Sequence, residues 1–261
     1  MESLPKLHST FIKSLIDLLN HDNRIDSLLG AGSMIHGGFD EYSDIDLIIV
    51  IKSEFYSDVM SKRKEFANSL NGLLSSFTGE HVGEPRLLIC LYSVPELLHV
   101  DLKFVNIDHL NQGLIENPII LWTSQKSTVE TILKESKIDW PNQSSQWFED
   151  RAWIWLHYAT AKVLRGELYE AIGMLAFFRE KVLGPLIHRR LSRSQRGMRK
   201  IDFLDFNSKD TLLQTIATYS KQSIISSLKK CIELYIDLRQ DQPPLSLIKG
   251  MPNILIDMID S

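Results

Sequence analysis

The sequence predicts an α+β protein with a mixed-sheet domain over residues 1–125 and an α-helical bundle over 140–261. Three observations favour this division. Short apolar runs of strand length, such as Leu47–Ile51, alternate with helical segments in the first half. In the second half, apolar residues recur at helical spacing while strand-like runs of Val and Ile become rare. The pattern changes near Ser144, which marks a boundary between an α/β part and an all-α part.

The first half alternates between helices and strands. Apolar residues from Leu7 to Leu19 have helical spacing and predict the first helix. Gly37 and Gly38 predict a tight turn, and a second turn near Pro95 separates the last two strands. The remaining predicted elements are strands over 25–31, 45–51, 86–92 and 98–105, and a second helix over 55–74.

The second half predicts about four helices followed by a short tail. Gly166 is a plausible end for the first helix, and the second helix is expected to bend near Gly184-Pro185. Pro243-Pro244 closes the bundle. The predicted helices span 147–164, 167–191, 206–219 and 224–238.

Composition excludes several classes of protein. With 44% hydrophobic and 24% charged residues, the 261-residue chain has the composition of a soluble globular protein. No apolar run is long enough to span a bilayer, and Met1–Lys6 lacks the pattern of a secretory signal, so we expect a cytoplasmic protein. Cys90 and Cys231 are predicted to be reduced core residues. The formal charge of −4 makes nucleic acid an unlikely main partner.

The most informative motif joins a glycine-serine pair to two aspartates. Gly32-Ser33 ends a predicted strand, and after ten further residues Asp44-Ile45-Asp46 opens the next strand. Residues two apart in a strand point to one face, so the two carboxylates converge and favour a cation between them. Carboxylate ligands suit Mg²⁺, which commonly completes its shell with water and phosphate oxygens. Gly32 allows close approach of a phosphate, and the amides of Ser33 and Met34 supply donors at a helix start. The motif therefore predicts a site for a metal-bound triphosphate.

A third acid lies in the strand predicted over 98–105. Period two places Asp101 and Lys103 on one face of this strand. Asp101 could complete a metal cluster with Asp44 and Asp46, or it could remove a proton from an attacking hydroxyl. Lys103 is a candidate for neutralising triphosphate charge, or a solvated lysine.

The pattern of Gly-Ser, ten residues, Asp-Ile-Asp and a later strand acid resembles the polymerase-beta-type nucleotidyltransferase superfamily. Together with a C-terminal helical bundle, it is similar to the aminoglycoside and lincosamide nucleotidyltransferases, which act in antibiotic resistance. The resemblance implies Mg²⁺-dependent transfer of a nucleoside monophosphate, such as AMP from ATP, to a hydroxyl with release of pyrophosphate. It implies that Gly32 and Ser33 hold the β- and γ-phosphates, that Asp44 and Asp46 hold the metals, and that Asp101 is the third acid.

The resemblance leaves the general base and the acceptor open. The base is Asp101 or a glutamate of the helical domain, for which Glu167 and Glu170 are candidates. The acceptor is expected to be a small hydroxylated molecule bound in a cleft between the domains, where Glu149, Asp150, Glu167 and Glu170 could attract a polycation. A protein or RNA acceptor, and a catalytically idle nucleotide-binding relative, are the alternatives. A homodimer is compatible with the resemblance.

One basic stretch also has two interpretations. Residues 188–200 carry five arginines and one lysine with no acid among them. A solvated connection between helices explains this run. Alternatively, Arg196 or Arg199 could reach a triphosphate or the end of an RNA.

Overall fold

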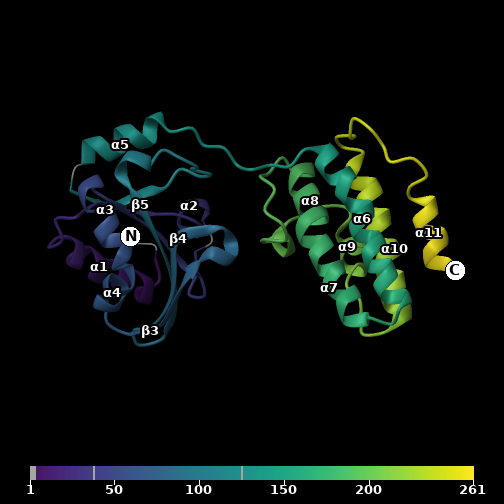
Figure 1. Ribbon diagram of the computed structural model, residues 1–261, viewed down its shortest axis with the longest axis horizontal. Coiled ribbons are helices and arrows are strands. Elements are labelled where there is room, and N and C mark those ends of the chain that lie inside the picture. The colour runs from purple at the N-terminus through teal and green to yellow at the C-terminus, as the bar shows by residue number, and fades with distance from the viewer. Residues whose placement is uncertain (1–3, 38, 125) are drawn as a thin grey trace. The chain divides into compact units, whose positions relative to one another are not determined.

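The computed structural model describes residues 4–37, 39–124 and 126–261 of the chain. The chain divides into two compact units, and the boundary along the chain lies between Asp139 and Trp140. The first contains a mixed sheet and the second is helical, so the predicted α+β class is confirmed (Figure 1). Gly38 of the predicted turn and the first three residues of the N-terminus lie outside the described residues.

The N-terminal unit is built on a six-stranded sheet with the order β3-β4-β5-β2-β1-β6. Strands β2 and β5 are parallel, and the other neighbouring pairs are antiparallel. The strands are β1 (Ile25–Gly30), β2 (Ile45–Ile51), β3 (Leu73–Gly79), β4 (Glu84–Ser93), β5 (Leu97–Asn106) and β6 (Ile119–Thr123). The helices are α1 (Lys6–Leu19), α2 (Ser33–His36), α3 (Tyr56–Ser61), α4 (Arg63–Ser69) and α5 (Lys126–Glu135), with 3-10 turns at Ser53–Phe55, Glu80–Val82 and Ile107–His109.

Alternation along β2 and β5 creates two different faces of the sheet. Leu47 and Leu102 are buried in the larger core, which also contains Phe11 of α1 and Phe66 of α4. A smaller core on the other face contains Ile48, Val50 and Val105 together with Val129 of α5. This second face also carries Asp46 and Asp101, because they alternate with the residues of the larger core. The sheet therefore supports a packed layer on one side and a candidate site on the other.

Two edge strands were not predicted from the sequence. Strand β3 includes Leu73 and Leu74, which helical spacing had assigned to the helix over 55–74; that helix instead ends at Ser69. Strand β3 lies at the edge of the sheet and pairs with β4 alone, and its residues Leu74 and Phe77 are 60% and 52% exposed. Its apolar residues therefore do not alternate between a buried and an exposed face, which is the pattern that predicts a strand. Strand β6 is the opposite edge of the sheet, has only five residues, and was also missed.

The C-terminal unit packs its helices around a separate core. Buried residues of this core include Phe148 and Trp153 of α6, Phe178 of α7 and Tyr235 of α10. The elements are α6 (Ser145–Leu164), α7 (Leu168–Phe178), a π-helical turn (Arg179–Leu183), α8 (Gly184–Arg190), a 3-10 turn (Ile201–Phe203), α9 (Lys209–Gln214), α10 (Lys221–Arg239) and α11 (Asn253–Asp260).

The second helix of this unit loses its regular α-helical hydrogen bonding just before Gly184, near the position of the predicted bend. The chain passes from α7 through the π-helical turn into α8, which starts at Gly184. A Cβ atom at Gly184 would lie 2.2 Å from the carbonyl oxygen of Gly197, so a glycine is needed where this loop contacts the helix. The helix predicted over 206–219 is too long. Within this range only α9 is helical, and residues 215–219 form an irregular segment that leads to Ser220, the N-cap residue of α10.

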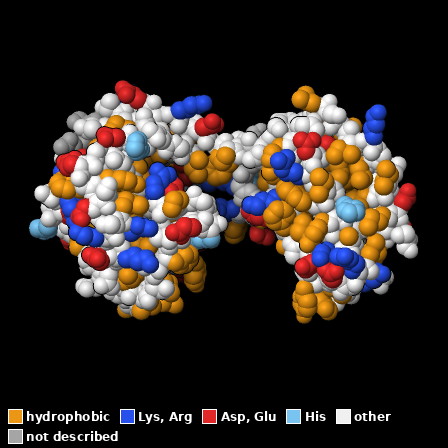
Figure 2. All heavy atoms as spheres, in the orientation of Figure 1, with side chains coloured by type: hydrophobic (Ala, Val, Ile, Leu, Met, Phe, Trp, Pro, Cys, Tyr) orange, Lys and Arg blue, Asp and Glu red, His pale blue; other side chains and the backbone are white. Residues whose placement is uncertain are grey.

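The helical unit exposes several large hydrophobic side chains at its surface. Ile154 and Tyr158, one turn apart on α6, are 64% and 44% exposed. Figure 2 shows a broad hydrophobic area on the visible face of this unit. Among the described residues, every helix is too short or too polar to cross a lipid bilayer.

Candidate active site

Parallel pairing of β2 with β5 brings together two acids that are far apart in sequence. Asp46 is the direct register partner of Asp101. Both side chains are half-buried, and that of Asp101 is 20% exposed. Their strand neighbours Leu47 and Leu102 point into the core on the opposite face. The predicted meeting of these two aspartates at one place on the sheet therefore has a structural basis in the backbone.

Gly32 lies directly against the carboxylate of Asp46. The chain leaves β1 through Ala31, whose amide donates to the Asp46 carbonyl at 2.9 Å. Gly32 then adopts a φ of +57°, and a Cβ atom placed on it would lie 1.8 Å from Oδ2 of Asp46. A side chain is thus excluded by both backbone conformation and space. The glycine is required for the turn to pass closely over the acid.

We expect Gly32→Ala to reduce the transfer activity that the sequence resemblance implies at least about a hundredfold, because the new methyl group would displace the Asp46 carboxylate. Gly83→Ala is the matched control, since Gly83 also has a positive φ, +74°, but its Cβ would contact nothing within 4 Å. Both variants carry the same backbone strain of about 1–2 kcal/mol. Steady-state rates and thermal unfolding would separate the clash from the strain. Equal loss of activity in the two variants would contradict the proposed contact.

Ser33 begins the short helix α2, as the sequence predicted for a helix start. Its Oγ atom is buried and has no hydrogen-bond partner. The amide of Met34 already donates to the carbonyl oxygen of Ala31 at 3.3 Å, so it is not the free donor that the sequence suggested. An orphaned buried hydroxyl beside a glycine turn fits a ligand oxygen.

The electrostatics at Asp101 link the three predicted aspartates. Burial raises the pKa of the Asp101 carboxyl, the neighbouring His99 opposes this by charge and hydrogen bonding, and the negative charge of Asp44 raises the pKa further. His99 Nε2 lies 3.0 Å from Asp101 Oδ1. Asp44 itself is half-buried and directly precedes β2. Asp101 is therefore linked to Asp44 by charge and to Asp46 by strand register.

The carboxylates do not form a closed metal cage by themselves. Over residues 4–37, 39–124 and 126–261, no group of three or more His, Cys, Asp or Glu side chains is arranged to hold a metal ion. Magnesium commonly binds through one or two carboxylates and takes its other ligands from water and phosphate. The oxygen donors of Asp44, Asp46 and Asp101, and the orphaned Ser33 hydroxyl, fit that chemistry without a preformed cage.

Lys103 lies on the same side of β5 as Asp101 but has a protein partner. Its Nζ is 3.0 Å from Oε2 of Glu84, which also accepts from Arg86. The hydrogen bond from Arg86 is the main cause that lowers the pKa of Glu84 to about 2; burial opposes it and Lys103 supports it. A role of Lys103 in nucleotide binding therefore requires it to leave, or to share, this ion pair.

His8 is a candidate positioning residue that sequence reasoning missed. Its side chain is only 1% exposed. Its Nε2 donates to the carbonyl oxygen of Ser43, the residue before Asp44, at 2.8 Å. The imidazole ring also meets Phe39 edge-on, with 4.9 Å between centroids. Helix α1 thereby holds the loop that delivers Asp44 and Asp46. A histidine within an apolar helix stripe was the available signal.

Replacing His8 with phenylalanine keeps a ring against Phe39 but removes the hydrogen bond to Ser43. We expect kcat to fall about tenfold, since a small shift of the loop moves the aspartates. His8→Asn, which can still donate, should recover part of the loss. His21→Phe is the control, because His21 bonds only the exposed carbonyl of Asp17. Unchanged kcat in His8→Phe would remove the positioning role.

Other predicted candidates have partners elsewhere. Glu167 and Glu170 both pair with Lys162 in the helical unit, where the hydrogen bond from Lys162 lowers the pKa of Glu167. Glu149, suggested as an acidic lining residue for a polycation, is wholly buried and bonded to four partners, so it is not available to a ligand.

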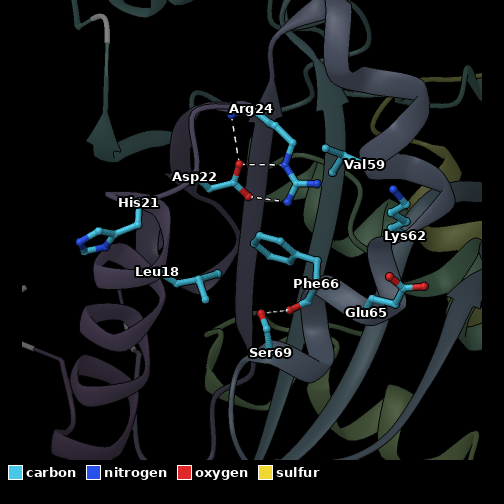
Figure 3. Close-up of a pocket in the computed structure, with 9 residues that line it drawn as sticks. All are labelled: Leu18, His21, Asp22, Arg24, Val59, Lys62, Glu65, Phe66 and Ser69. Carbon is cyan, nitrogen blue, oxygen red and sulfur yellow. Dashed lines mark hydrogen bonds and ion pairs between the residues drawn. The ribbon is translucent and has the colours of Figure 1, made fainter.

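A cavity of about 480 Å³ lies on the other side of the sheet from the aspartates (Figure 3). Val59 and Phe66, which line it, belong to the larger core beneath α1. Arg24 at its edge donates two hydrogen bonds to the carboxylate of Asp22, at 2.9 and 2.7 Å, and forms an ion pair with Asp58. Because the arginine is already neutralised, this cavity is a poor triphosphate site.

Comparisons with known proteins were made for sequence and structure. No family model matches the chain, and none of the curated protein sequences does. Two similar solved structures are an aminoglycoside 6-adenyltransferase from Bacillus subtilis and a nucleotidyltransferase-like protein from Exiguobacterium sibiricum 255-15. The first has 13% identity and a TM-score of 0.36, covering 90% of this chain and 89% of that one. The second has 10% identity and a TM-score of 0.41, covering 87% and 74%.

Proposed function

We propose that this chain transfers a nucleoside monophosphate, AMP from ATP, to a hydroxyl of a small molecule and releases pyrophosphate. Aminoglycoside and lincosamide antibiotics are the proposed acceptors, and the enzyme would act in antibiotic resistance in the cytoplasm. The observation that carries the proposal is the position of Asp46, opposite Asp101 in register and in contact range of Gly32. No structural need of the sheet explains two half-buried acids as direct neighbours.

The proposed roles follow from the chemistry of the site. Asp44 and Asp46 would hold Mg²⁺ with Asp101 as third acid, and the ion would supply charge compensation for the phosphates. Gly32 lets the turn pass close to the Asp46 carboxylate, while the buried Ser33 hydroxyl can donate to a phosphate oxygen. The protein's contribution is mainly positioning and charge stabilisation.

In the reaction, the acceptor oxygen forms a bond to the α-phosphorus as the bond to the pyrophosphate oxygen breaks. The hydroxyl proton must go to a base. Asp101 suits this role because burial raises its pKa, against the opposing effect of His99, and a raised pKa makes a carboxylate a better proton acceptor. Glu167 and Glu170 remain alternatives, although each is paired with Lys162.

The proposal is tested by incubating the full chain with Mg²⁺, ATP and a panel of aminoglycosides and lincosamides. Mass spectrometry should find one product heavier by a nucleoside monophosphate, with one pyrophosphate released per product. Repeating the assay with GTP, CTP and UTP identifies the preferred nucleotide. Release of pyrophosphate with label transferred only to protein or RNA would replace the small-molecule acceptor. No transfer to any acceptor class would overturn the proposed activity.

A further inference from the structure

The loop between α8 and α9 concentrates positive charge on the helical unit (Figure 1, the green segment beside α8). The side chains of Arg193, Arg199 and Lys200 are exposed there. No acid occurs from residue 188 to 200, and Asp202 is the first to follow. The chain as a whole has a formal charge of −4, so this basic surface is a local feature that net charge conceals.

This loop is held in a defined shape from both sides. Glu180 accepts a hydrogen bond from the Met198 amide at 3.0 Å, and Gly197 packs against Gly184. On the other side, Gln195 exchanges hydrogen bonds of 2.6 and 2.9 Å with the backbone of Gln143. A loop fixed in this way presents its cations in a constant arrangement, which lowers the entropy cost of binding.

Aromatic rings accompany the cations. The Arg196 guanidinium lies over the ring of Trp140, 4.3 Å from its centroid, and Trp140 Nε1 donates to the Gln195 carbonyl at 3.0 Å. Phe203 follows in the next 3-10 turn and is 86% exposed. Its amide donates to the Lys200 carbonyl at 3.2 Å, so the ring and the lysine are close along the chain. An exposed phenylalanine beside several cations has no evident role in packing.

We propose that this basic loop, defined by Arg193, Arg196, Arg199, Lys200 and Phe203, is a binding surface for single-stranded RNA. Cations that follow a sugar-phosphate backbone, together with a ring on which a base can stack, are the two components of single-strand recognition. Acidic proteins would use the cations without a ring; an anionic membrane also accommodates an exposed ring beside cations, so vesicles serve as a competing ligand in the test. The inference goes beyond the proposed transfer reaction, since binding requires neither ATP nor Mg²⁺.

The first experiment measures fluorescence anisotropy of a labelled mixed-sequence RNA strand with the full chain, without nucleotide, over a range of salt concentrations. The variant is Arg193→Ala/Arg199→Ala/Lys200→Asn; asparagine is used because Lys200 has a φ of +58°, which asparagine tolerates. We expect the slope of log affinity against log salt to fall by about 2, as for three lost phosphate contacts. The matched control Arg165→Ala/Lys221→Ala/Lys249→Ala removes three exposed cations elsewhere in the unit and should leave the slope unchanged.

The second experiment tests stacking. Phe203→Ala should weaken RNA binding about tenfold, whereas Phe203→Tyr should retain it. Leu245→Ala is the control, because Leu245 is 97% exposed in the same unit. Circular dichroism would verify that each variant is folded.

Three results would overturn the proposal: no RNA binding at low salt, equal loss in the two triple variants, or Phe203→Ala binding like the parent. Stronger binding to polyglutamate or to phosphatidylserine vesicles than to RNA would also overturn it. Because ATP is absent, failure here leaves the proposed transfer reaction standing, and failure of the transfer assay leaves RNA binding standing.

Discussion

Asp46→Asn is expected to abolish nucleotidyl transfer, lowering kcat/KM at least about a thousandfold, equivalent to roughly 4 kcal/mol of transition-state stabilisation. The substitution keeps the size of the side chain and changes one oxygen and the charge. It thereby removes an anionic ligand from the site that Gly32 and Asp101 define. Calorimetric titration with Mg²⁺ and ATP should show weaker binding alongside the loss of rate.

The folded protein should tolerate this change. The substitution keeps the size of the side chain that lies against Gly32, so we expect the free energy of unfolding to change little. Asp17→Asn is the control, because Asp17 is an exposed acid on α1. It should change neither rate nor stability. Retained transfer by Asp46→Asn would mean that the metal site is elsewhere in the chain.

The central strands could be predicted from sequence because their signal is local. Strand β2 was placed at its observed bounds, since the five apolar residues Leu47–Ile51 are buried on both faces and only Asp46 interrupts the strand's apolar character. Period two along β5 also placed Asp101 and Lys103 on the face opposite Val100. The register that sets Asp46 against Asp101 is a long-range property, and spacing alone could suggest it but not determine it.

Other features depend on partners distant in sequence. The contact of His8 with Ser43 joins α1 to the loop before β2; the position of His8 in an apolar helix stripe indicates its burial, but not its partner. Glu149 was predicted to be an accessible acid because it occurs in a charged stretch at the start of a helix. It is instead enclosed by α10 and the loop before α11. Burial of a charge depends on which elements pack over it, and that is decided by the tertiary fold.

Glu149 connects three parts of the helical unit through a single buried carboxylate. Oε1 accepts from Trp153 Nε1 at 2.9 Å and from the Ile248 amide at 3.1 Å. Oε2 accepts from the Tyr235 hydroxyl at 2.6 Å and from Arg239 at 3.0 Å. Burial by itself would raise the pKa of Glu149, but these hydrogen bonds outweigh it and hold the pKa below its ordinary value. The network therefore stabilises the ionised form.

Glu149→Gln is accordingly expected to lower the free energy of unfolding by about 3 kcal/mol at neutral pH, because Arg239 is left without its buried counter-charge. Urea denaturation followed by tryptophan fluorescence suits this test, since four of the five tryptophans lie in the helical unit. Glu233→Gln is the control: Glu233 is an exposed partner of Lys230, and its loss should cost less than about 1 kcal/mol.

The deficit of Glu149→Gln should also depend on pH with a defined sign. A carboxyl whose pKa is lowered on folding contributes stability above its ordinary value of 4.5, and this contribution is lost as the pH falls through the folded pKa. The difference in unfolding free energy between parent and variant should thus be largest near neutral pH and shrink below 4.5. A deficit that is constant across this range would show that the glutamine changes packing, and that the charge of Glu149 does not stabilise the fold.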